Sequence, residues 1–276
     1  VADGTHYVVL GDWVEQHVAE STGKDGRGIL PVVVGIDAPE LASGADDVQI
    51  VRLVADARAT RDVADGEIEI SGSLGSHLLT WQYATAVAGM LLGINPFDQP
   101  DVESAKIAAR GLLDARPEPL PAQFIDHGVE VVGPSAVLGS ASTVSEAVRA
   151  LEGALPAGGY VAIQAYLDRL AHPELEAVRH LVAARTGRPV TFGWGPRFLH
   201  STGPYHKGGP SSGVFLQVTG ALDDDLEIPE RPFTYGQLIA AQAAGDAAVL
   251  AGKGMPVVTL RVRDADGIAA IIAAVS

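Results

Sequence analysis

Tyr160-Val161-Ala162-Ile163-Gln164-Ala165 is a nearly continuous apolar run, which is typical of a β-strand covered on both faces. Leu30-Pro31-Val32-Val33-Val34 is a second run of this kind. Helical patterns separate such runs along the whole chain. The alternation predicts an α/β fold of three layers, in which a doubly wound, mostly parallel sheet is joined by right-handed crossovers.

The predicted elements follow from apolar periodicity and from capping residues. Thr143 precedes Glu146 at the spacing of a capping box, and Gly187 follows a helix as a C-terminal cap. The predicted strands are 6–10, 29–35, 48–54, 67–71, 129–133, 160–165, 190–193, 214–219 and 257–262. The predicted helices are 12–21, 79–92, 102–114, 143–151, 173–185, 235–251 and 267–275.

A proline-rich segment marks the expected boundary between two lobes. Arg116-Pro117-Glu118-Pro119-Leu120-Pro121 has three prolines in six residues, which disfavours helix and strand alike. We therefore expect one α/β lobe over 1–115 and a second over 122–276, or one continuous domain of the same total length.

Composition excludes several classes of protein. Hydrophobic residues make up 47% of the 276 residues and charged residues 19%, which excludes a disordered chain. The net charge of −15 repels a polyphosphate backbone, so we expect no nucleic-acid partner. The absence of cysteine excludes a disulfide scaffold and thiol catalysis. No apolar stretch reaches the roughly 18 residues of a membrane span and no signal peptide is apparent, so we expect a cytoplasmic protein without a membrane partner.

The first candidate site segment is Glu20-Ser21-Thr22-Gly23-Lys24. Glu20 lies at the end of the predicted helix 12–21, where the negative end of the helix dipole disfavours a charged carboxylate. A general base that works near neutral pH requires such an environment. A solvated surface glutamate is the alternative.

The second segment follows an apolar helix and contains Phe97-Asp98-Gln99. Gln99 and Lys106 are seven residues apart, so a helix that begins near Gln99 presents both on one side. An amide and an ammonium on one face can hold and polarise sugar oxygens. The alternative is a capped loop with a surface lysine.

The third segment, residues 193–210, contains Arg197, His200, His206 and Lys207 among many glycines and prolines. A long, non-periodic polar loop after a buried strand favours a functional role over a structural turn. Histidine suits proton transfer, and Arg and Lys suit a phosphate or a bound sugar. The two histidines have no acidic or histidine neighbour at ligand spacing, so we expect no metal site.

Together the three segments resemble motifs of the phosphoglucose isomerase family. Glu20-Ser21-Thr22-Gly23-Lys24 is similar to its Glu-Ser-Asn-Gly-Lys motif, whose Glu is the isomerisation base. Phe97-Asp98-Gln99 with Lys106 resembles Phe-Asp-Gln-Trp-Gly-Val-Glu-Leu-Gly-Lys, whose Gln and Lys contact the sugar. Residues 195–203 with 206–209 resemble a signature of the isomerase part of bacterial transaldolase–glucose-6-phosphate isomerase fusion proteins.

The resemblance implies a sugar-isomerase-type fold and interconversion of glucose 6-phosphate and fructose 6-phosphate without a cofactor. It implies that Glu20 moves a proton between C1 and C2 through a cis-enediol, while Lys106 and a histidine assist ring opening. The usual Gln-His segment between the first two motifs is not found, and Pro100 replaces the Trp after Gln. We therefore assign ring opening to His200, with His206 as the competing residue.

The same resemblance implies a substrate-binding group. Gln99 would hold a sugar or phosphate oxygen, and Arg197 or Lys207 would offset negative charge, with His206 beside them. The family's N-terminal sugar-isomerase-type domain, which supplies most phosphate-binding residues, is not found in the sequence, and we expect it as a partner. The family commonly builds its active sites across a dimer, so a homodimer is a further expectation.

Two rival functions stay open. One is a non-catalytic sugar-phosphate-binding or assembly module, because the phosphate loop is not found in the sequence. The other is a different sugar-phosphate isomerase or a sensing domain, because a fold does not determine a function.

Overall fold

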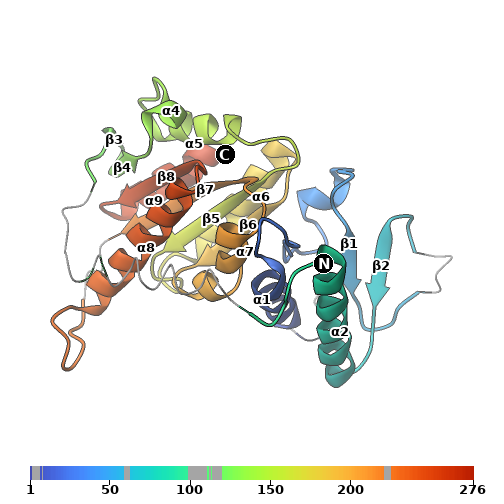
Figure 1. Cartoon of the computed structure of the whole chain (residues 1–276). Helices are drawn as coiled ribbons and strands as arrows, with labels where there is room; N and C mark the ends of the chain where they lie inside the picture. The colour runs from blue at the N-terminus through green and yellow to red at the C-terminus, as the bar shows by residue number, and fades with distance from the viewer. Residues whose placement is uncertain are drawn as a thin grey trace. The chain divides into compact units, whose positions relative to one another are not determined.

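The computed structural model has two compact units (Figure 1). Unit 1 comprises Val1–Gln99 with His200–Pro210, and unit 2 comprises Pro100–Leu199 with Ser211–Ser276. The structure describes residues 1, 7, 9–58, 63–98, 111, 113, 120–220 and 225–276.

Unit 2 is built on a six-stranded mixed sheet in the order β3-β4-β8-β7-β5-β6. Strands β8, β7, β5 and β6 run parallel, while β4 pairs antiparallel with β8 and β3 antiparallel with β4. The strands are β3 (Phe124–Asp126), β4 (Val129–Val132), β5 (Tyr160–Tyr166), β6 (Val190–Trp194), β7 (Gly213–Gly220) and β8 (Val257–Val262). The fold is therefore α/β with a mostly parallel sheet, as the apolar runs predict.

Helices cover both faces of this sheet, because side chains alternate along each buried strand. On β5, Val161 and Ile163 join a core with α5, α6 and α9, whereas Gln164 bonds to Asp246 of α8 on the opposite face. The helices are α4 (Ser135–Leu138), α5 (Val144–Gly153), α6 (Glu176–Thr186), α8 (Tyr235–Gly252) and α9 (Ala265–Val275), with 3₁₀ turns η3 (Pro173–Leu175) and η4 (Arg197–His200). The result is a three-layer arrangement.

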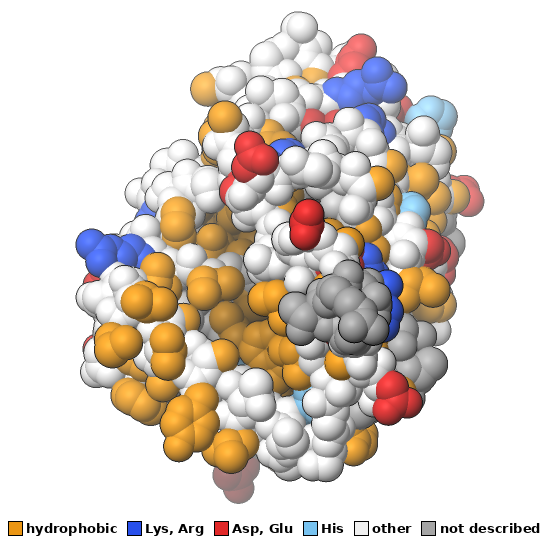
Figure 2. Space-filling view, turned by 90° about the vertical axis from the view of Figure 1, so that its right-hand side faces the viewer, with side chains coloured by type: hydrophobic (Ala, Val, Ile, Leu, Met, Phe, Trp, Pro, Cys, Tyr) orange, Lys and Arg blue, Asp and Glu red, His pale blue; other side chains and the backbone are white. Residues whose placement is uncertain are grey.

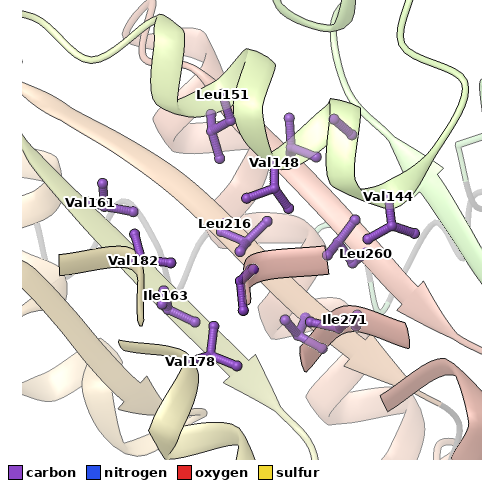
Figure 3. Close-up of a cluster of buried hydrophobic side chains, with 14 of the residues drawn as sticks. Val144, Val148, Leu151, Val161, Ile163, Val178, Val182, Leu216, Leu260 and Ile271 are labelled. Atoms are coloured by element: carbon purple, nitrogen blue, oxygen red, sulfur yellow. The ribbon is translucent and has the colours of Figure 1, made fainter. Parts of the chain in front are cut away.

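The main core of unit 2 lies between the sheet and the helices α5, α6 and α9 (Figure 3). Its side chains are almost all aliphatic and fully buried. Those labelled in the figure are Val144, Val148, Leu151, Val161, Ile163, Val178, Val182, Leu216, Leu260 and Ile271. Burial of aliphatic side chains on this scale is the main force that holds the sheet and these helices together.

The predicted capping box of α5 is confirmed. Thr143 Oγ1 accepts from the backbone N–H of Glu146 at 3.2 Å, and Glu146 Oε2 accepts from the N–H of Thr143 at 3.2 Å. The hydrogen bonds that the Glu146 carboxylate accepts, first those from Ser142, lower its pKa. The predicted cap at Gly187 is also confirmed, because that residue is left-handed, with φ +63°.

Thr143→Ala is expected to destabilise the protein by about 1 kcal/mol, because it leaves an N–H of the first turn of α5 without its side-chain acceptor. Urea unfolding measures the change. Thr143→Ser keeps the accepting oxygen and serves as the control. Equal stability of the Ala and Ser variants would show that the cap does not stabilise α5.

Unit 1 is smaller, and its described residues contain a parallel pair of strands and three α-helices. Strand β1 (Ile50–Leu53) pairs with β2 (Glu67–Ile70), and the buried residues Leu10, Val14 and Val18 of α1 pack with Leu53. The helices are α1 (Leu10–Thr22), α2 (Leu74–Leu92) and α7 (Gly203–Gly208), with the 3₁₀ turn η1 (Pro39–Ala42). Unit 1 therefore carries the first motif and most of the third.

Several expectations differ from the structure. Residues 29–35 form no strand in the described part of the chain: the N–H of Ile29 donates to Thr22 Oγ1 at 3.0 Å, and Pro31 has no N–H. The division of the chain falls after Gln99, whereas we expected it at 116–121. Segment 200–210, expected in the second lobe, belongs to unit 1 because it packs against the end of α1. The predicted helix 102–114 lies almost wholly outside the described residues.

Candidate active site

Glu20 lies in the last turn of α1, as the sequence predicts. The buried face of the helix repeats at Leu10, Val14 and Val18, which leaves the Glu20 side chain half-buried. One turn earlier, the ring of His17 stacks on the indole of Trp13, with centroids 4.9 Å apart. Burial lowers the pKa of His17, and the nearby Glu20 carboxylate opposes that shift. The charge of Glu20 therefore acts on an imidazole of its own helix.

The loop that follows α1, residues 23–28, brings the first motif against α7 of the third. Gly23 lies so close to Tyr205 that a Cβ built on it would be 2.3 Å from Tyr205 Cα. The N–H of Gly26 donates to the carbonyl of Gly208 at 2.9 Å. Because these contacts join backbone to backbone, the loop fixes α7 relative to the end of α1.

The same loop also holds the turn that begins the second motif. Lys24 is 2% exposed, and its Nζ donates to Asn95 O at 3.0 Å, to Asp98 Oδ1 at 3.1 Å and to the carbonyl of Asp98. Arg27 donates to the carbonyl of Leu92, at the end of α2. Three segments far apart in the sequence therefore meet at residues 23–28 within one unit.

Helix α7 is buried along its whole length. His206 is 2% exposed and Lys207 is 3% exposed, and neither side chain is without an interaction partner. Burial, with the positive charge of Lys207, lowers the pKa of His206 to about 3. His206 is therefore a neutral imidazole at neutral pH. This segment, expected as an open polar loop, is instead a packed helix.

His206 makes stability depend on pH in a defined window. In the unfolded chain it binds a proton below about pH 6.5, whereas the folded chain does so only below about pH 3. Because the unfolded state binds this proton more readily, acidification favours unfolding. His206 therefore lowers the free energy of unfolding by about 1.4 kcal/mol for each pH unit between these two pKa values. At pH 7 the cost is absent, because the group is neutral in both states.

We expect the free energy of unfolding of the wild type to fall more steeply with acidification than that of His206→Asn. Urea unfolding at a series of pH values from 7 to 4 measures both slopes. Parallel slopes for the two proteins would contradict a neutral, buried His206.

Of the remaining predicted residues, Arg197 and His200 lie at the two ends of the 3₁₀ turn η4. His200 is exposed at the end of η4 and belongs to unit 1, whereas Arg197 is exposed and belongs to unit 2. Gln99 and Lys106 lie outside the described residues. The structure thus joins the segments of Glu20 and His206–Lys207, places Arg197 and His200 at exposed positions, and leaves the positions of Gln99 and Lys106 as predictions.

Unit 1 also contains a pocket of about 500 Å³, whose lining includes His17 and Ser21 of α1 but not Glu20. Its walls come from α1, α2 and the turn that follows α2, and most of the lining surface is apolar. The lining residues are His17, Ser21, Leu79, Gln82, Tyr83, Thr85, Ala86, Pro96 and Phe97. Figure 2 shows hydrophobic side chains gathered on the face of the molecule that carries α2. An apolar lining suits an apolar group better than a polyhydroxylated sugar.

The contacts of Lys24 are not predicted by the sequence, in which this residue is part of the first motif but has no assigned role. Nor is a buried polar row in unit 2. There Gln164 donates to Asp246 Oδ2 at 3.1 Å, and Gln217 donates to the carbonyl of Ala243 at 3.0 Å, which ties α8 to the sheet. Burial, and secondly the Asp246 carboxylate, raise the pKa of Tyr166 well above its ordinary value. The sequence feature that could have predicted this polar row is a glutamine within each of two mostly apolar strands, β5 and β7.

No family model matches this chain, and no curated protein is significantly similar to it. Among solved structures, one match is the crystal structure of a hypothetical protein, TT0462, from Thermus thermophilus. The two share 14% sequence identity with a TM-score of 0.41, over 99% of this chain and 75% of the other. None of the helices in the described residues is long and apolar enough to cross a membrane.

Proposed function

We propose that this chain carries out aldose–ketose isomerisation of a sugar phosphate in the cytoplasm, interconverting glucose 6-phosphate and fructose 6-phosphate. The proposal rests on the three motifs and their similarity to phosphoglucose isomerases. One observation supports it most: the loop 23–28 contacts both the turn that begins the second motif and the helix of the third. A shared site requires such convergence.

The chemistry assigned to Glu20 is proton transfer between neighbouring carbons. Its carboxylate removes the proton from C2 of the open-chain aldose while O1 gains a proton, which gives the cis-enediol. The carboxylic acid then returns a proton to C1, and O2 loses its proton as the C2 carbonyl forms. Water supplies the proton that O1 gains and takes up the proton that O2 loses, so the step balances, and the catalytic base needs only a carboxylate beside the carbon chain.

The other roles belong to residues of the second and third motifs. Lys106 and His200 assist ring opening by moving a proton between the ring oxygen and the hydroxyl, and Gln99 holds a sugar or phosphate oxygen. Arg197 or Lys207 offsets the negative charge of the substrate. The buried, neutral His206 remains the competing base for ring opening, since it lies on the helix that packs against the end of α1.

A second candidate function, a binding or assembly module that is completed by another lobe, is favoured by the surface of unit 1. Its described sheet has two parallel strands, although parallel sheets are usually larger and covered on both faces. On α2, the apolar side chains of Tyr83, Met90 and Leu91 are 67%, 71% and 78% exposed. An N-terminal isomerase domain or a second copy of the chain would cover such a surface.

Turnover by the purified chain distinguishes the two functions. The chain is assayed alone and together with an N-terminal sugar-isomerase-type domain of the kind that the resemblance implies, on glucose 6-phosphate and on other hexose and pentose phosphates. Isomerisation of glucose 6-phosphate in either assay supports the enzyme. Binding of the sugar phosphate without turnover in both assays would favour the module and contradict the isomerase, while turnover of a different sugar phosphate alone would change the substrate.

A further inference from the structure

The ammonium group of Lys24 is almost completely buried, and hydrogen bonds to three acceptors replace its contacts with water. The side chain is 2% exposed, and Nζ donates to two backbone carbonyls, of Asn95 and Asp98, as well as to the Asp98 carboxylate. Burial of a charge is costly unless it is paired and hydrogen-bonded. The three acceptors meet that requirement, and all of them lie on one short turn.

The turn that Lys24 contacts lies next to a proposed substrate-binding residue in the sequence. Lys24 lies four residues after Glu20, and the Asn95–Asp98 turn ends directly before Gln99. The two segments are separated by 71 to 74 residues of chain, so one side chain spans between the proposed base and the proposed sugar-binding motif.

The hydrogen bonds of Lys24 do more than neutralise its charge, because they also restrict the backbone of the turn. The Asp98 carboxylate is 55% exposed, so the ion pair by itself is partly solvated and contributes little. Two of the three bonds go to backbone carbonyls, and these restrict the path of the main chain itself. An ammonium with two carbonyl acceptors fixes the conformation of the turn, whereas a surface ion pair does not.

We propose that Lys24 is a positioning residue: it holds the Asn95–Asp98 turn, which directly precedes Gln99 in the sequence, at a fixed place relative to the end of α1 that carries Glu20. This inference rests on the proposed function. Misplacement of a binding group by about 1 Å can cost roughly 100-fold in rate, which makes such a contact matter for catalysis.

The test compares Lys24→Met with Arg52→Met. Methionine keeps the long apolar stem of Lys24 but cannot donate to the turn. Arg52 lies on β1 of the same unit and donates two bonds to Glu67, at 2.8 and 2.6 Å, so its loss removes a similar ion pair elsewhere. Lys24→Arg keeps the charge and tests whether an ammonium is required.

Two readouts separate positioning from stability. The first is the ¹⁹F NMR signal of fluorophenylalanine at position 97, where Phe97 is 87% exposed on the turn. The signal is assigned as the one that disappears in Phe97→Leu. The second is kcat and KM for glucose 6-phosphate, measured well below the melting temperature. We expect Lys24→Met to shift or broaden the Phe97 signal, raise KM and lower kcat/KM by about 10- to 100-fold, with Arg52→Met unchanged in all of these.

A Phe97 signal identical to that of the wild type in Lys24→Met would overturn the positioning role, even if the variant melts earlier. A change of equal size in Arg52→Met would do the same, because it would show a general loss of stability. If the wild type turns over no sugar phosphate, the proposed function fails by itself, while the Phe97 signal still decides what Lys24 does.

Discussion

Glu20→Gln is expected to lower isomerase turnover by about 10²–10⁴-fold, the usual contribution of a general base. The amide has nearly the same shape as the carboxylate but cannot accept the C2 proton. Because Glu20 is half-buried at the end of α1, the change leaves the buried face of that helix intact. The measurement is kcat for glucose 6-phosphate in a coupled assay, with urea unfolding as a check on the fold.

Glu15→Gln is the matched control, because it makes the same change of charge on the same helix. It should keep the activity of the wild type. Near-normal turnover by Glu20→Gln would remove Glu20 from the mechanism, and an equal loss in both variants would point to the charge of the helix and not to a base.

Gly23→Ala is expected to destabilise unit 1 by about 1–3 kcal/mol, the usual cost of forcing atoms into a filled space. Gly23 has φ −76°, a value that any residue can adopt, so its backbone conformation does not require glycine. The requirement is close approach: the added Cβ would lie 2.3 Å from Tyr205 Cα and 2.7 Å from Tyr205 N. Backbone atoms cannot rotate away, so α7 must move with His206 and Lys207.

Urea unfolding and the isomerase assay measure this effect. Gly75→Ala is the control, because no heavy atom lies within 4 Å of a Cβ at that position in α2 and alanine is the better helix former. The control should be neutral or slightly stabilising. A Gly23→Ala variant as stable and as active as Gly75→Ala would contradict the close packing of the first and third motifs.

The sequence predicts the fold of unit 2 well, because its signals are local and strong. The apolar run 160–165 and the capping box at Thr143 each correspond to an observed element, β5 and the start of α5. The run 30–34 is equally apolar but forms no strand, since its Pro31 lacks an N–H and Ile29 bonds to a side chain. The apolar composition of such a segment indicates that it is buried or extended. Composition alone does not indicate whether the segment pairs with a neighbouring strand.

The site is predicted less completely, because its contacts depend on residues far apart in the sequence. The position of Glu20 at a helix end follows from periodicity alone. The burial of His206 and of Lys24 does not, because the sequence around each is polar and rich in glycine, as in an open loop. Close approaches such as that of Gly23 and Tyr205 create this burial, and a single sequence carries no direct signal for them.

The central claim is that Glu20 moves a proton between C1 and C2 of a sugar phosphate. Its most direct test is ¹H NMR of glucose 6-phosphate in D₂O with the protein as its gene encodes it. We predict that the wild type exchanges the C2 proton for deuterium as fructose 6-phosphate forms, and that Glu20→Gln does neither. Isomerisation at the wild-type rate by Glu20→Gln, or no isomerisation by the wild type, would contradict the claim.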